Sequence, residues 1–101
     1  MGISKKSEID TLSHYLLRLC DEHGVIDPMQ TSLVASDDLI DGGFIDSMGL
    51  AYMQSIIAEE FSVEISPEML ITELRNIHSI AAYLVEKLPP KLLQSYVNKH
   101  A

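Results

Sequence analysis

The chain has 101 residues, 47% of them hydrophobic, which suits one small domain with a hydrophobic core. Its formal net charge is −8, and the stretch from Asp21 to Glu73 contains twelve acidic residues and no lysine or arginine. A surface with this charge repels phosphate backbones, so we exclude nucleic-acid binding. The same acids would attract partners that carry basic patches.

The chain has a single cysteine, Cys20, so it can form neither an intramolecular disulfide nor a Cys-x-x-Cys metal cluster. Cys20 lies within a helical apolar pattern, and we expect it in the core. No apolar run approaches the roughly 20 residues that a membrane span needs. The N-terminus has no signal-peptide pattern. We therefore expect a cytoplasmic protein without membrane association.

The first predicted helix runs from about Ser7 to Glu22 and ends at Gly24. Apolar residues recur there at three- and four-residue spacing, namely Ile9, Leu12, Leu16, Leu19 and Cys20. The following segment, Val25 to Asp46, has no clean periodicity and contains several turn signals. A connection this long in a compact domain is usually functional. Its apolar residues predict that it packs across the core: Ile26, Leu33, Val34, Leu39, Ile40, Phe44 and Ile45.

Three further helices are predicted, and each has an apolar face or a start signal. Ser47 to Phe61 carries an apolar stripe of Leu50, Met53, Ile57 and Phe61, with Ile56 beside it. A short helix from about Pro67 to Leu74 follows the cap Ser66. The last begins after the cap Asn76, stops at Pro89-Pro90 and buries Ile77, Ile80, Ala81, Leu84 and Leu88. The sequence thus predicts an all-α bundle of three main helices and one short helix, with a long loop between the first two.

The stretch Asp41 to Leu50 places a serine, Ser47, where a glycine-containing loop meets the start of a helix. A modifying enzyme could reach a hydroxyl there, and unpaired N–H groups and the helix dipole would stabilise a phosphodiester. The ordinary role of such a serine is to cap the helix. Asp46 is an equally good cap, however, and Leu50 stands where a capping box needs Glu or Gln. From these residues alone both roles stay open.

The run Asp46-Ser47-Met48 at a helix start resembles the phosphopantetheine attachment motif of acyl and peptidyl carrier proteins. The similarity includes the loop Asp38 to Met48, the stretch Glu59 to Glu68 and the last helix, and it covers about residues 8–88. It implies a small four-helix carrier-protein bundle at residues 1–88. Residues 89–101 lie outside the similarity; their apolar residues among polar ones predict a C-terminal tail that can add a short extra helix. The similarity also implies 4′-phosphopantetheine on Ser47, with Asp46 helping to position the modifying enzyme, and no catalytic residue.

The resemblance also implies three kinds of partner for a monomeric carrier: a phosphopantetheinyl transferase, an adenylating ligase or acyltransferase, and a downstream acyl-accepting enzyme. The docking surface would be the exposed face of the second helix, comprising Met48, Ala51, Tyr52, Ser55 and Glu59. Tyr52 and Ala58 stand where fatty-acid carriers have acids, and Gly49 is similar to aminoacyl, D-alanyl or peptidyl carriers. These differences favour a dedicated carrier of acyl or aminoacyl thioesters in a specialised biosynthetic pathway.

The alternative is a non-catalytic helical interaction module without a prosthetic group. It would explain the bundle and the acidic surface, but not the attachment motif. Loss of Ser47 should distinguish the two, because only a carrier needs it. No metal site is predicted: Asp37, Asp41 and Gly42 fit an EF-hand register, but Leu39 and Met48 fall where oxygen ligands are required. No Gly-x-Ser-x-Gly motif indicates a serine hydrolase.

Overall fold

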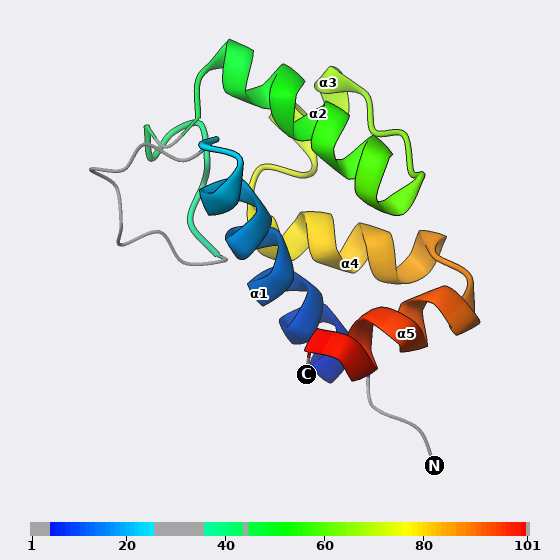
Figure 1. Ribbon diagram of the computed structural model, residues 1–101. Helices are drawn as coiled ribbons and strands as arrows, with labels where there is room; N and C mark the ends of the chain where they lie inside the picture. The colour runs from blue at the N-terminus through cyan, green and yellow to red at the C-terminus, as the bar shows by residue number, and fades with distance from the viewer. Residues whose placement is uncertain (1–4, 26–35, 44, 101) are drawn as a thin grey trace.

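The computed structural model describes the backbone of residues 5–25, 36–43 and 45–100 and the side chains of residues 7–25, 36–43, 45–46 and 48–96. In this part of the chain five helices form (Figure 1): α1 (Lys5–Glu22), α2 (Ser47–Phe61), α3 (Pro67–Thr72), α4 (Ile77–Lys87) and α5 (Pro90–His100). The described residues contain no strand, so the all-α prediction is confirmed. In the tail, α5 adds a fifth helix to the four predicted ones.

The helix starts follow the capping residues that the sequence offers. Ser66 caps α3 by accepting the Met69 N–H at 3.2 Å, and Asn76 caps α4 by accepting the Ser79 N–H at 2.7 Å. At the other end of α1, Gly24 has φ +70°, the left-handed conformation typical of a helix stop. The short α3 ends at Thr72, two residues before the predicted end. These boundaries are set by local chemistry.

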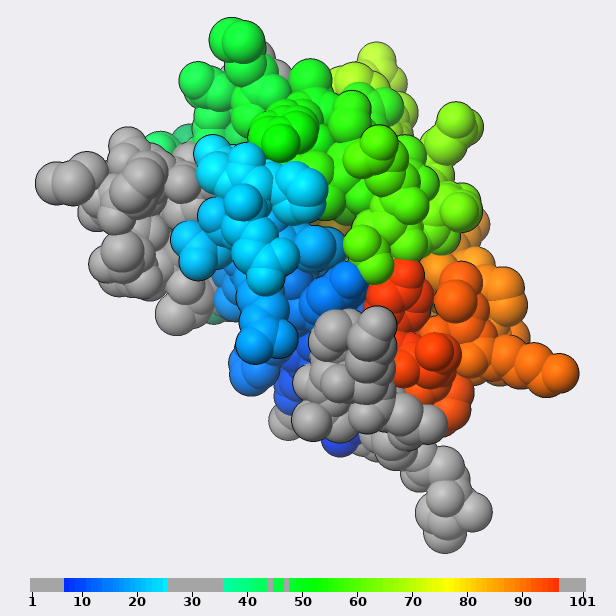
Figure 2. Space-filling view, in the orientation of Figure 1, coloured from blue at the N-terminus to red at the C-terminus, as the bar shows by residue number. Residues whose placement is uncertain are grey.

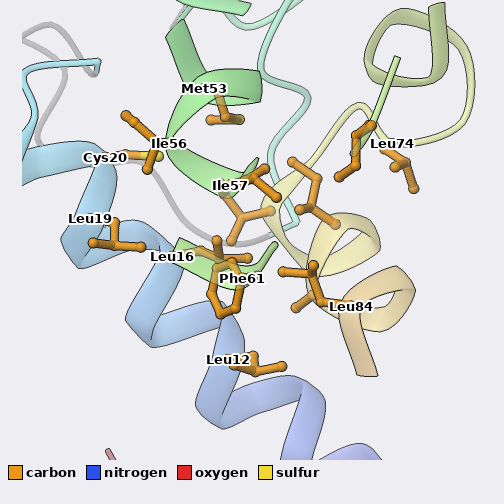
Figure 3. Close-up of a cluster of buried hydrophobic side chains, with 14 of the residues drawn as sticks. Leu12, Leu16, Leu19, Cys20, Met53, Ile56, Ile57, Phe61, Leu74 and Leu84 are labelled. Atoms are coloured by element: carbon orange, nitrogen blue, oxygen red, sulfur yellow. The ribbon is translucent and has the colours of Figure 1, made fainter. Parts of the chain in front are cut away.

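The core lies where α1 packs against α4 and α5 and where α2 packs against α3. Figure 3 shows side chains of α1, α2 and α4 pointing into a common cluster. The predicted apolar faces are buried except for Ile9 and Leu50, which are only partly buried at the edges. Cys20 is 3% exposed, and burial raises the pKa of its thiol to about 12, so it stays protonated at neutral pH. Its predicted core role is confirmed.

Helix α5 is joined to the bundle through both apolar and polar contacts. Leu93 belongs to the same buried cluster as residues of the other helices, and Figure 2 shows α5 (red) beside α1, below the end of α2. Tyr96 donates its hydroxyl to the backbone oxygen of Glu60 at 2.7 Å, and Tyr15 donates to the Glu60 carboxylate at 2.6 Å. Burial and this carboxylate raise the pKa of both phenols. The division of the chain at residue 88 stays a prediction.

None of the helices in the described ranges is both long enough and apolar enough to cross a bilayer.

Candidate functional site

The loop that leads into α2 is a compact hydrogen-bonded turn. Three backbone N–H groups donate to backbone oxygens within it. The bonds are Gly42 to Asp38 at 2.9 Å, Gly43 to Ile40 at 3.0 Å, and Ile45 to Leu39 at 3.0 Å. Gly43 has φ +76°, which an L-residue adopts only with strain. The turn therefore brings Ile45, the residue before the cap of α2, next to Leu39.

Two side chains of this turn are anchored in the core: Leu39 is 1% exposed and Ile45 6%. The prediction that the long loop packs on the core is confirmed for these two, while Ile40 is only half-buried. The remaining four predicted residues lie outside the described part of the chain: Ile26, Leu33, Val34 and Phe44. The buried side chains of Leu39 and Ile45 therefore fix the position of this turn before α2.

The first turn of α2 is capped by Asp46. Its Oδ1 accepts the N–H of Gly49 at 2.8 Å, and its backbone oxygen accepts that of Leu50 at 3.0 Å. Ser47 follows as the first residue of the helix. Asp46 therefore fills the capping role that the sequence left open between the two residues.

The acidic turn is paired with one cation, Arg75, from the connection between α3 and α4. Its guanidinium reaches the Asp38 carboxylate (Nε–Oδ2 2.8 Å) and the Asp41 carboxylate (Nη2–Oδ1 2.9 Å). The Asp41 backbone N–H and Arg75 lower the pKa of Asp38. Sequence reasoning missed this residue. The available signal was charge, because Arg75 is the single lysine or arginine between Arg18 and Lys87.

A family model described as a phosphopantetheine attachment site matches residues 19–84, which is more than half of the chain. The chain belongs to this family. Its members are carrier domains with covalently attached 4′-phosphopantetheine and are not themselves catalytic. The predicted family and cofactor are thereby confirmed. Curated proteins and solved structures gave no match.

The matched region of this carrier domain includes the turn, the start of α2 and Arg75, and it ends before α5. Helix α5, in which Tyr96 contacts the Tyr15 ring and the Glu60 backbone, thus lies outside the matched carrier region. Carriers of this family interact in general with the transferase that modifies them and with enzymes that handle acyl groups.

The five residues predicted for partner docking lie on one exposed side of α2, at helical spacing. Met48 is 80% exposed and Tyr52 46%, while Ala51, Ser55 and Glu59 are exposed as well. The Tyr52 ring meets the His23 ring edge-on, with centroids 6.0 Å apart, so it is held against the end of α1. On this side of α2 the residues near the helix start are therefore uncharged, and the one acid, Glu59, lies near its other end.

An open groove of about 670 Å³ lies further along α2, at its junction with the segment that leads into α3. It is lined by Gln54, Ser55, Ala58, Glu64, Ile65, Ser66, Pro67 and Met69. Gln54 is seven residues after Ser47, a distance of about 10 Å at the usual helical rise. The groove and the attachment motif of the carrier thus share one helix.

Gly49 allows the turn to lie close to α2, and a Gly49→Ala change tests this. A Cβ at position 49 would lie 2.7 Å from Cγ2 of Ile45, a buried β-branched side chain with little rotamer freedom. Overpacking typically costs 1–3 kcal/mol, whereas alanine gains up to about 1 kcal/mol of helix propensity. We expect the free energy of unfolding, measured with urea, to fall by about 1–2 kcal/mol.

Ile45→Leu provides the control for this prediction, because leucine lacks the Cγ2 methyl group that the added Cβ would meet. The double variant should recover stability relative to Gly49→Ala alone. A Gly49→Ala protein as stable as the wild type would show that the turn can move away at no cost.

Proposed function

We propose that Ser47 is the attachment residue of this carrier. Its hydroxyl oxygen attacks the β-phosphorus of coenzyme A within a phosphopantetheinyl transferase. A new O–P bond forms, 3′,5′-adenosine bisphosphate leaves, and a base of the transferase takes the hydroxyl proton. The observation that supports this most directly is the position of Ser47, which opens α2 directly after its cap within the matched family region.

The start of α2 suits the charged product of this reaction. A phosphodiester on residue 47 would carry its negative charge at the positive end of a 15-residue helix. Such a placement typically stabilises an anion by 0.3–1 kcal/mol at an exposed site. Because Asp46 already satisfies the Gly49 N–H, modification does not disturb the cap. The thiol at the end of the arm then holds an acyl or aminoacyl group as a thioester.

The exposed face of α2 supports a docking role in the same reaction cycle. Met48 and Tyr52 offer apolar surface beside the attachment point, of the kind that anchors protein interfaces. Ala51 and Ser55 leave that face flat, and Glu59 places an acid at its far end. We propose that the transferase, a loading ligase or acyltransferase, and an acyl-accepting enzyme each contact this face in turn.

The composition of this face favours a specialised biosynthetic pathway over fatty acid synthesis. Tyr52 and Ala58 stand where carriers of fatty acid synthesis have acids, so partners would read an apolar surface more than a charge pattern. An adenylating ligase or a dedicated acyltransferase is the matching source of cargo for a small cytoplasmic carrier of this kind.

Intact-protein mass tests the proposal most directly. The wild-type chain is incubated with coenzyme A and a broad-specificity phosphopantetheinyl transferase, and the product is fragmented to locate any addition. We expect one phosphopantetheine group, on Ser47. A folded chain that gains no mass would overturn the proposal. The interaction module without a prosthetic group would then become the better description, and a pull-down would identify its partner.

A further inference from the structure

Arg75 holds the turn before α2 through its side chain and its backbone together. In addition to the two ion pairs, its Nη2 donates to Asp38 Oδ1 at 3.3 Å, and its backbone oxygen accepts the N–H of Leu39 at 2.8 Å. Leu39 in turn accepts the N–H of Ile45 at 3.0 Å. A continuous set of contacts therefore runs from the α3–α4 connection to the residue directly before the cap of α2.

Asp38 is the centre of this arrangement. One of its oxygens, Oδ1, also accepts the backbone N–H groups of Ile40 at 3.0 Å and Asp41 at 2.8 Å, which closes the turn. Its other oxygen, Oδ2, faces the Arg75 guanidinium. A single carboxylate thus both shapes the turn and ties it to Arg75.

We infer that Arg75 is a positioning residue for the attachment site. By bridging Asp38 and Asp41 it holds the turn that presents Ser47 to the transferase and to later partner enzymes. The inference rests on the proposed function of Ser47. Arg75 lies 28 positions after Ser47 in the sequence, and its guanidinium contacts Asp38 and Asp41 of the turn. It acts through the turn, from Asp38 and Leu39 to Ile45.

The chemistry of the guanidinium explains why an arginine stands here. A planar fork of N–H donors reaches two carboxylates at once, whereas a lysine ammonium is a compact point charge on a flexible stem. Without this cation, the carboxylates of the turn would face one another uncompensated and repel. The Arg75 side chain is 34% exposed and that of Asp41 77%, so solvent and salt weaken the pairs. We therefore expect the contacts to order the turn more than to stabilise the whole domain.

Arg75→Gln is the variant that tests the inference, with Arg18→Gln as its matched control. Arg18 lies exposed on α1, so the control makes the same change of net charge away from the turn. A turn that is ordered for only part of the time presents a smaller fraction of competent carrier, which raises the apparent KM of the transferase and leaves kcat unchanged. We expect a two- to fivefold rise in KM, roughly the size of exposed charge-pair effects. In the Arg75→Gln protein, hydrogen exchange at the Ile45 amide, which donates to Leu39, should also be faster than in the wild type.

Two further variants keep the test decisive. Arg75→Lys restores the positive charge without the planar guanidinium, so its KM should lie between those of Arg75→Gln and the wild type. Asp41→Asn removes one exposed partner of Arg75 and leaves Asp38 in place, so it should raise KM by less than Arg75→Gln does. If Arg75→Gln folds poorly, the rise in KM of Asp41→Asn tests the inference in its place. An Arg75→Gln protein with wild-type KM overturns the inference while Ser47 is still modified. A wild-type chain that accepts no phosphopantetheine overturns the proposed function instead, and the inference with it.

Discussion

A Ser47→Ala variant is expected to fold normally and to accept no phosphopantetheine. The loss should be complete, because the phosphodiester needs an oxygen that alanine lacks. The fold should persist because Asp46, not Ser47, caps α2 through its bond to the Gly49 N–H. Alanine also has a high intrinsic helix propensity, so the substitution does not disfavour the helix. We expect the free energy of unfolding to stay within about 0.5 kcal/mol of the wild type.

Ser95→Ala provides the control, since Ser95 is an exposed serine on α5, outside the docking face of α2. It should gain the full mass of one phosphopantetheine group under conditions in which Ser47→Ala gains none. A mass gain on the Ser47→Ala protein would place the attachment on another side chain. A Ser47→Ala protein that unfolds would instead show that the serine has a structural role.

The helix starts and the attachment motif could be predicted from the sequence because both depend on residues close together in the chain. Ser66 and Asn76 each cap a helix through a bond to a residue three positions later. The Asp46-Ser47-Met48 motif is likewise local, and its place at the start of α2 follows from the apolar spacing of that helix. Patterns of this kind need no knowledge of the tertiary fold.

Features that depend on distant residues were not predictable in the same way. Arg75 meets Asp38 across 37 positions, and its isolation as a cation does not indicate which of the many carboxylates it pairs with. Tyr15 and Tyr96 both donate to Glu60, although 45 and 36 positions separate them from it. Each of these contacts joins two helices or two loops, so only the assembled fold brings the partners together.

Helix α5 also depends on residues that are distant in the sequence, although its start has a local signal. Pro89-Pro90 was interpreted as a stop for α4, which it is, but Pro90 is also the first residue of α5, a position that proline favours. Whether the tail remains helical depends on Leu93 and Tyr96 reaching a surface formed by other helices. That surface is not encoded within the tail itself.

Replacing Phe61 with alanine should cause a large loss of stability. Phe61 is the last residue of α2 and is 2% exposed. Its ring packs edge-on against Tyr15 with centroids 6.0 Å apart, and against Tyr96 at 5.0 Å. Figure 3 shows it pointing into the cluster beside α1. Truncation of a buried phenylalanine usually lowers the free energy of unfolding by about 3–5 kcal/mol, a large share of the 5–15 kcal/mol typical of a domain.

Urea unfolding followed by circular dichroism measures this loss, with Phe61→Leu as the control. Leucine keeps most of the volume but not the ring contacts, so we expect a loss of about 1–2 kcal/mol there. Because Phe61 and Ser47 lie at opposite ends of α2, the folded fraction of Phe61→Ala should still accept phosphopantetheine at Ser47. A loss below about 1 kcal/mol would mean that the cluster collapses around the missing ring. In that case the aromatic contacts would not be what fixes the end of α2 against α1 and α5.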